Sequence, residues 1–274
     1  MTTKNYLALI SIVFILCPFV SSAQFNNNFG FQGSYHYHPS ITYAQAKERG
    51  MNLKPWWRSD IGIYMPFASA TYTHIYRTFD NAGNISTINS STSSVAFKPT
   101  FGMCEGLFCP IATLKDKSMI AFAYQGNFAL GKFQIQPDQY GNPGGSCSVY
   151  EAGVALSLDY KLGVDAQLDS KQRTGITFGA GFYPNMLLSV YQNNGGGSVS
   201  FDPFVKVDFS FFLGVCFKLK TMVIFRNGAY LQTDANSDNN SYTSTNPNST
   251  SIIGSPSFAV ALVVLPYSWD WGND

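Results

Sequence analysis

The stretch Val149-Tyr-Glu-Ala-Gly-Val-Ala-Leu-Ser-Leu-Asp-Tyr-Lys-Leu162 alternates between apolar residues and small or charged ones. Successive side chains of a strand point to opposite faces. One face therefore carries Tyr150, Ala152, Val154, Leu156, Leu158, Tyr160 and Leu162, and the other carries Glu151, Gly153, Ala155, Ser157, Asp159 and Lys161. The two tyrosines are separated by about 33 Å along a strand, or about 25 Å of height at the usual tilt, which is the height of the apolar band of a membrane-spanning barrel.

The same alternation recurs along the chain, in residues 94–104, 118–130, 174–183 and 198–217. One face is apolar, and the other is mostly Gly, Ala, Ser and Thr with a few charges, which suits the crowded interior of a narrow barrel. In 94–104 we assign Val95 and Phe97 to the apolar outer face and Lys98 to the lumen. Segments 60–79, with a change of phase near Pro66 that indicates a bulge, 222–233 and 256–266 complete the set. The sequence predicts an all-β fold, an eight-stranded antiparallel transmembrane β-barrel over residues 57–267.

The composition agrees with a lipid-facing outer surface. Charged residues make up only 12% of the chain, and aromatic residues make up 16%. A soluble domain has about 25% charged residues, whereas a barrel wall in lipid needs few. The net charge of +1 gives no electrostatic basis for binding nucleic acid.

Both ends of the chain differ from the barrel segment. Lys4, an apolar run over 6–20 and Ser21-Ser-Ala23 predict a signal peptide over 1–23 that is cleaved after Ala23. Residues 24–56 then form a periplasmic extension with a short helix over 41–49, and 268–274 form a tail. Trp56 and Trp57 at the first strand, with Tyr150 and Tyr160, are expected to form aromatic girdles at the membrane boundaries.

The connections differ in composition at the two ends of the barrel. Those after odd-numbered strands are rich in Asn, Ser, Thr or Gly and are expected outside the cell: Asp80–Ser93, Pro137–Ser148, Gln192–Gly197 and Asp234–Ile253. Those after even-numbered strands carry most of the connector Lys and Arg and are expected on the periplasmic side: Glu105–Lys117, Gly163–Arg173 and Lys218–Thr221. Asp80–Ser93 and Asp234–Ile253 are the best candidates for contacts with a partner.

The charges assigned to the lumen are Lys98, Glu151, Asp159, Lys161, Asp202, Lys206 and Asp208. We expect them to pair with one another, because an uncompensated charge in a narrow barrel is costly. A continuous wet path along them would instead indicate a pore for small solutes or ions.

Cysteines and histidines give few other candidates for chemistry. Cys104 and Cys109 are close enough in sequence for a disulfide, with Cys147 and Cys216 left free, and an exported protein permits one. His36 and His38 lie in the N-terminal extension without a third metal ligand. His74 lacks a neighbouring nucleophile motif. We expect no metal, no cofactor and no enzymatic activity.

With its signal peptide, alternating strands and Asn-rich loops, the chain resembles small outer-membrane β-barrel proteins, particularly those of Bacteroidota. The resemblance is one of pattern over about 57–267, and the tail Tyr267-Ser-Trp-Asp-Trp-Gly-Asn-Asp274 departs from it because the last strand does not end the chain on an aromatic residue. It implies a monomeric barrel in outer-membrane lipid with a structural or interaction role. Its partner would be an envelope protein bound at the loops or the periplasmic face. The alternatives are the pore, and a secreted soluble β-sandwich with Phe122, Phe209 and Phe211 in a core between its sheets.

Overall fold

The computed structural model describes residues 58–80, 85–115, 118–140, 142–167, 173–192, 194–226, 228–233, 249–266 and 268. The expected signal peptide, the extension with its helix, Trp56, Trp57 and nearly all of the tail lie outside these residues. The described elements are β1 (Ser59–Phe79), β2 (Ile85–Lys115), β3 (Ser118–Ile135), β4 (Gly145–Gly163), α3 (Val164–Gln167), β5 (Thr174–Tyr191), β6 (Asn194–Phe212), β7 (Cys216–Ile224), β8 (Ala229–Thr233) and β9 (Ser249–Leu265). None of the described helices is long and apolar enough to cross a membrane.

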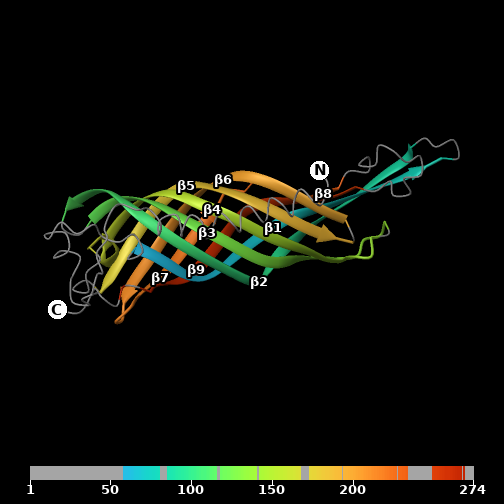
Figure 1. Ribbon diagram of the computed structural model, residues 1–274. Helices are drawn as coiled ribbons and strands as arrows, with labels where there is room; N and C mark the ends of the chain where they lie inside the picture. The colour runs from blue at the N-terminus through green and yellow to red at the C-terminus, as the bar shows by residue number, and fades with distance from the viewer. Residues whose placement is uncertain are drawn as a thin grey trace, which may run out of the picture.

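The strands form one antiparallel sheet that closes on itself (Figure 1). Each strand from β1 to β7 pairs with the next, β7 pairs with β9, and β9 pairs with β1. β7 and β8 occupy one position in the ring, because β7 pairs with residues 257–265 of β9 and β8 pairs with residues 250–253. In the described part of the chain the ring therefore has eight positions. The expected all-β, eight-stranded antiparallel barrel is confirmed.

Several expected strand boundaries are wrong. β2 continues to Lys115, so most of Glu105–Lys117 is strand, and Ile85 already begins β2 within the expected loop Asp80–Ser93. β6 ends at Phe212, and the chain reverses over Leu213–Val215, where Gly214 has a φ of +84° that favours glycine. Residues 218–221, expected as a turn, lie in β7.

We call the two ends of the barrel by their connections. The loop end carries the connections β1–β2, β3–β4, β5–β6 and β8–β9, and the terminal end carries β2–β3, β4–β5, β6–β7, the start of β1 and the end of β9. β1 and β2 continue past the other strands at the loop end and form a projecting hairpin (Figure 1).

The wall of the barrel is apolar outside and small or charged inside over the half nearer the terminal end. Exposed apolar side chains occur at every position of the ring, among them Ile63, Phe101, Phe122, Leu158, Phe178, Phe201, Leu219 and Leu262. The buried inner positions hold Ala121, Ala123, Ala155, Ala259 and Ala261 beside the charged residues. Phe122 and Phe209 are 45% and 48% exposed, and Phe211 is half-buried, so the soluble β-sandwich with these rings in its core is overturned.

Near the loop end the pattern is reversed. The interior is an apolar cluster that includes Phe97, Phe133, Val149, Leu187 and Ile252, while the exposed outer positions include Ser69, Lys98, Lys132, Gln134 and Ser146. An aqueous environment outside this end accounts for the reversal, since apolar side chains are then buried inward. The barrel wall thus faces two different solvents along its length.

Bulges produce the reversal on two strands. β2 pairs Pro99 with Gly131 and then Phe101 with Leu130, so Thr100 is an extra residue that flips the faces of the strand. β9 has a similar shift near Pro256, seen in its pairing with β1. The expected change of phase at Pro66 is wrong, because the inward side of β1 keeps the even-numbered residues from Asp60 to His74.

Leu156, an exposed residue midway between the tyrosines of β4, tests the lipid-facing assignment. Leu156→Arg should lower the free energy of unfolding by about 2–4 kcal/mol in lipid vesicles, because arginine at the midplane of a bilayer is costly. Urea titration of the reconstituted barrel measures this. Ser146→Arg, on the exposed polar wall of the same strand, is the matched control and should leave the free energy unchanged.

Candidate functional site

A network of alternating charges fills the lumen near the terminal end. Four lysines and four aspartates, counted over the described residues, take part: Asp60, Asp159, Lys161, Asp165, Lys206, Asp208, Lys218 and Lys220. The closest contacts join Lys220 to Asp60 at 2.7 Å, Lys206 to Asp159 at 2.9 Å and Lys218 to Asp165 at 2.9 Å. The two signs balance, so this part of the lumen carries no net charge.

Neighbouring side chains complete the network. Lys161 and Lys218 lie 4.3 and 5.2 Å from the centroid of the Phe108 ring, which stabilises desolvated cations through cation–π interactions. Two glycines provide the space. A Cβ added at Gly106 would lie 2.7 Å from Asp60 Oδ1, and one at Gly179 would lie 2.4 Å from Asp159 Oδ1.

A second cluster lies around Arg226, in the gap between β7 and β8. Its guanidinium donates to Glu151 over 3.0 and 3.3 Å, to Asp202 over 3.4 Å and to the Tyr230 hydroxyl over 2.6 Å. Because one arginine faces two carboxylates, neutral donors supply further hydrogen bonds to both of them. The Tyr183 hydroxyl donates to Glu151, and Asn185 and Ser200 donate to Asp202. Arg226 therefore joins β4, β6 and β8 through the interior.

The β3–β4 connection closes the barrel at the loop end. Asp138 lies with its Oδ2 2.8 Å from His74 Nδ1, and its Oδ1 accepts the backbone N–H groups of Tyr140 and Asn142. Burial alone would raise the pKa of Asp138, but these hydrogen bonds outweigh it and hold the pKa below the ordinary 3.8. The Asn142 amide donates to the Tyr72 hydroxyl and accepts from the Tyr191 hydroxyl at 2.7 Å.

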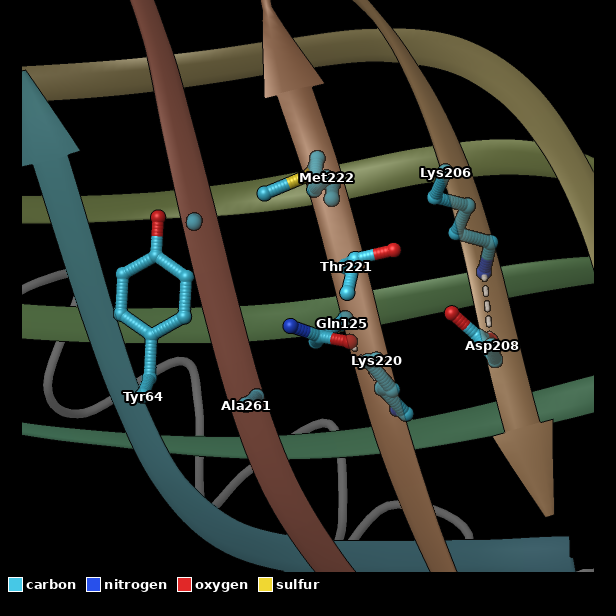
Figure 2. Close-up of a pocket in the computed structure, with 10 residues that line it drawn as sticks. Tyr64, Gln125, Lys206, Asp208, Lys220, Thr221, Met222 and Ala261 are labelled. Carbon is cyan, nitrogen blue, oxygen red and sulfur yellow. Dashed lines mark hydrogen bonds and ion pairs between the residues drawn. The ribbon is translucent and has the colours of Figure 1, made fainter.

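Two small voids lie among the side chains of the lumen. Each has a volume of about 10 Å³, which is room for about one water molecule. Figure 2 shows one of them, with Tyr64 on one side, the Lys206–Asp208 pair on the other and Met222 between them. Glu151, Asp159, Lys206 and Asp208 are engaged in ion pairs with other described residues of the lumen. This geometry favours the expected pairing of the lumen charges over a path lined by unpaired charges.

The structure places most of the expected lumen charges inside. Glu151, Asp159, Lys161, Asp202 and Asp208 are buried there, and the Lys206 side chain is only 10% exposed. The assignment of Lys98 to the lumen is wrong, because the bulge at Thr100 turns its side chain to the outside, and Val95 and Phe97 point inward instead.

Sequence reasoning missed five members of the two clusters: Asp60, Asp165, Lys218, Lys220 and Arg226. Lys218 and Lys220 alternate with Phe217 and Leu219, and this alternation is the signal that indicates a strand in place of the expected turn. Asp165 follows the end of β4 and lies on α3, and no sequence signal assigns it to the lumen.

The other candidates are placed as follows. The Cys104–Cys109 disulfide is wrong: both thiols are free, with Cys104 buried in the lumen and Cys109 exposed on the outside, since five residues along a strand lead to the opposite face. Tyr150 and Tyr160 lie exposed on the outer wall. In the described ranges, no Ser or Cys is hydrogen-bonded to His74, and no three His, Cys, Asp or Glu residues form a metal-binding cluster.

Comparisons with solved structures found barrels from the outer membrane. The outer membrane protein OprG from Pseudomonas aeruginosa is 10% identical, over 74% of this chain and 95% of that chain, with a TM-score of 0.40. Neisserial surface protein A (NspA) is 12% identical, over 73% of this chain and 97% of that chain, with a TM-score of 0.29. No protein-family model and no curated protein matches the chain. Neither structural match carries a function to this chain.

Replacing Arg226 with a neutral residue should strongly destabilise the barrel. Arg226→Met leaves Glu151 and Asp202 buried and uncompensated, so the free energy of unfolding should fall by about 3–5 kcal/mol. Urea titration of the reconstituted barrel measures the change. Adding Glu151→Gln and Asp202→Asn to Arg226→Met should restore most of the loss. A triple variant as unstable as the single one would show that Arg226 acts by packing and not by charge.

Asp138 should make the closure at the loop end sensitive to acid. Its pKa is lower in the folded protein than the ordinary 3.8, so its contribution is complete above about pH 4 and disappears as the pH falls through the lowered pKa. Hydrogen exchange of the Tyr140 and Asn142 amides should accelerate on the order of tenfold in Asp138→Asn, because two hydrogen bonds lose their charged acceptor. Exchange of the Val149 amide in β4 is the control and should not change. Equal exchange at Tyr140 and Asn142 in both proteins would contradict this role.

Proposed function

We propose that the protein is an outer-membrane barrel with a structural or interaction role: a rigid, sealed anchor that presents its loop end outside the cell. The observation that carries this proposal is the belt of exposed apolar side chains around a closed barrel whose lumen is filled with paired charges. An aqueous environment would not favour this outer wall, whereas lipid does. The filled lumen favours presentation over conduction. Export would use the signal peptide over residues 1–23, with cleavage after Ala23.

The projecting β1–β2 hairpin is the part best suited to contact a partner. In the described residues, the β1–β9 ladder reaches Ile75 and the β2–β3 ladder reaches Phe97. Beyond these residues, in the described ladder, β1 and β2 pair only with each other, and Thr78 and Ser86 join them by a side-chain hydrogen bond. Unpaired strand edges are templates for adding another strand. A partner in the envelope or outside the cell that adds a strand here fits an accessory or adhesive role.

The base of the hairpin is firmly supported. His74 and Tyr72 of β1 are buried, and they hold the β3–β4 connection through Asp138 and Asn142. The hairpin therefore emerges from a packed mouth at a defined position. A monomeric barrel suffices for this presentation, since the ring closes within one chain.

Electrophoresis of the outer-membrane fraction in detergent, with and without boiling, tests the anchor. The unheated protein should migrate at a different apparent size from the boiled protein, because the closed ring of strand pairs resists detergent until heat opens it. Recovery in the soluble fraction without a heat shift would contradict the proposal.

The orientation is tested by labelling intact cells with a membrane-impermeant maleimide. Ser90→Cys in the hairpin should react, in a Cys109→Ser background that removes the exposed native thiol. Leu213→Cys, exposed at the terminal end, is the matched control and should react only after the cells are opened. The reverse labelling pattern would place the hairpin inside the cell and contradict the proposed role.

A further inference from the structure

Two lysines face each other on the outer wall where the apolar belt ends. Lys98 on β2 and Lys132 on β3 are direct partners in the strand ladder, and both side chains are exposed. The next outward row towards the terminal end is Phe101, Leu130 and Tyr150, which are successive ladder partners on β2, β3 and β4. Two residues along a strand correspond to about 7 Å, so the lysine pair lies about one outward row beyond these apolar residues, towards the loop end.

Without a bound anion, the repulsion between Lys98 and Lys132 destabilises the pairing of β2 with β3. Like charges that lie directly opposite each other destabilise a strand pair. Within the described part of the chain, neither lysine forms an ion pair with a carboxylate, whereas Lys161, Lys206, Lys218 and Lys220 all do. The lumen thus has its lysines paired, and the outer wall leaves these two available.

The bulge on β2 creates the pair. Without the extra residue Thr100, the alternation that places Phe101 and Met103 outside would turn Lys98 into the lumen. The bulge instead directs Lys98 outward beside Lys132 and leaves the Thr100 side chain exposed next to it. Lys132 is in turn opposite Ser148 on the outer face of β4. Two ammonium groups flanked by two hydroxyls suit the oxygens of one phosphate.

We propose that Lys98 and Lys132 bind the phosphate headgroup of an anionic lipid in the leaflet at the loop end, with its acyl chains against Phe101, Leu130 and Tyr150. The apolar row directly beneath the two charges favours an amphiphile over a free anion, because it offers the acyl chains a surface in register with the headgroup. This inference rests on the proposed placement of the barrel in a membrane. The bound phosphate supplies the negative charge that the opposed lysines lack.

The test is native mass spectrometry of the full-length barrel in neutral detergent, with phosphatidic acid as the probe. A basic residue near a lipid surface contributes about a fivefold gain in binding. Phosphatidic acid binding should therefore fall about fivefold in Lys98→Gln and about 30-fold in Lys98→Gln/Lys132→Gln. Phosphatidylcholine, which is zwitterionic, should bind weakly and equally to all variants.

Three controls separate the outcomes. Arg173→Gln removes an exposed cation at the terminal end and should leave phosphatidic acid binding unchanged. Lys98→Glu creates a cross-strand ion pair with Lys132, so it should keep the heat shift and lose the lipid. Displacement of phosphatidic acid by millimolar inorganic phosphate would assign the pair to free phosphate and overturn the lipid assignment.

Failure of this inference is distinguishable from failure of the proposed function. Unchanged lipid binding in Lys98→Gln/Lys132→Gln, with a normal heat shift, would overturn the lipid site and leave the barrel assignment intact. Loss of the heat shift in the unmodified protein would overturn the membrane placement itself.

Discussion

Closing an eight-position sheet leaves an interior that its own side chains must fill, and every charge placed there must be neutralised by another side chain. The lumen satisfies this constraint with a balanced set of lysines and aspartates and with Arg226 between two carboxylates. The constraint reaches to individual glycines, since a methyl group at Gly106 or Gly179 would occupy the space of the ion pairs. A network of this kind links distant strands through the interior, and two voids of about 10 Å³ lie beside it.

The same strands also meet two external solvents. On β3 and β4 the odd-numbered residues face inward along the whole strand, and only the residue types change. The inner positions pass from Ala121 and Asp159 to Phe133 and Val149, and the outer positions pass from apolar residues to Lys132 and Ser146. β2 and β9 reach the same result by bulges near Pro99 and Pro256, beyond which the inward and outward residues of the strand are exchanged. Proline cannot donate to the ladder, so the pairing is weakest where it occurs and an extra residue costs least.

The presence or absence of a bulge explains what the sequence could and could not predict. Where the alternation is uninterrupted, as in 149–162, it predicts the strand, its faces and the inward direction of Glu151, Asp159 and Lys161. The alternation alone predicts the wrong face for Lys98, because a single extra residue inverts the strand. The charges of Lys218 and Lys220 favour a turn in the sequence because charge is normally a surface signal, whereas a barrel lumen buries charge away from water. The pairing partners of Asp165 and Arg226 depend on closure between distant strands, which no local pattern contains.

The paired charges of the lumen move the question of function to the outer surfaces. Of these, the β1–β2 hairpin has polar side chains, and its base is fixed by the buried contacts of Tyr72 and His74. The lysine pair at the bulge lies below it, at the boundary of the apolar belt. A lipid phosphate held there would fix the height of the barrel in the membrane and so set how far the hairpin projects. The bulge that inverts β2 therefore acts on both faces of the barrel wall: it turns Phe97 into the cluster beneath the mouth and Lys98 to the outside.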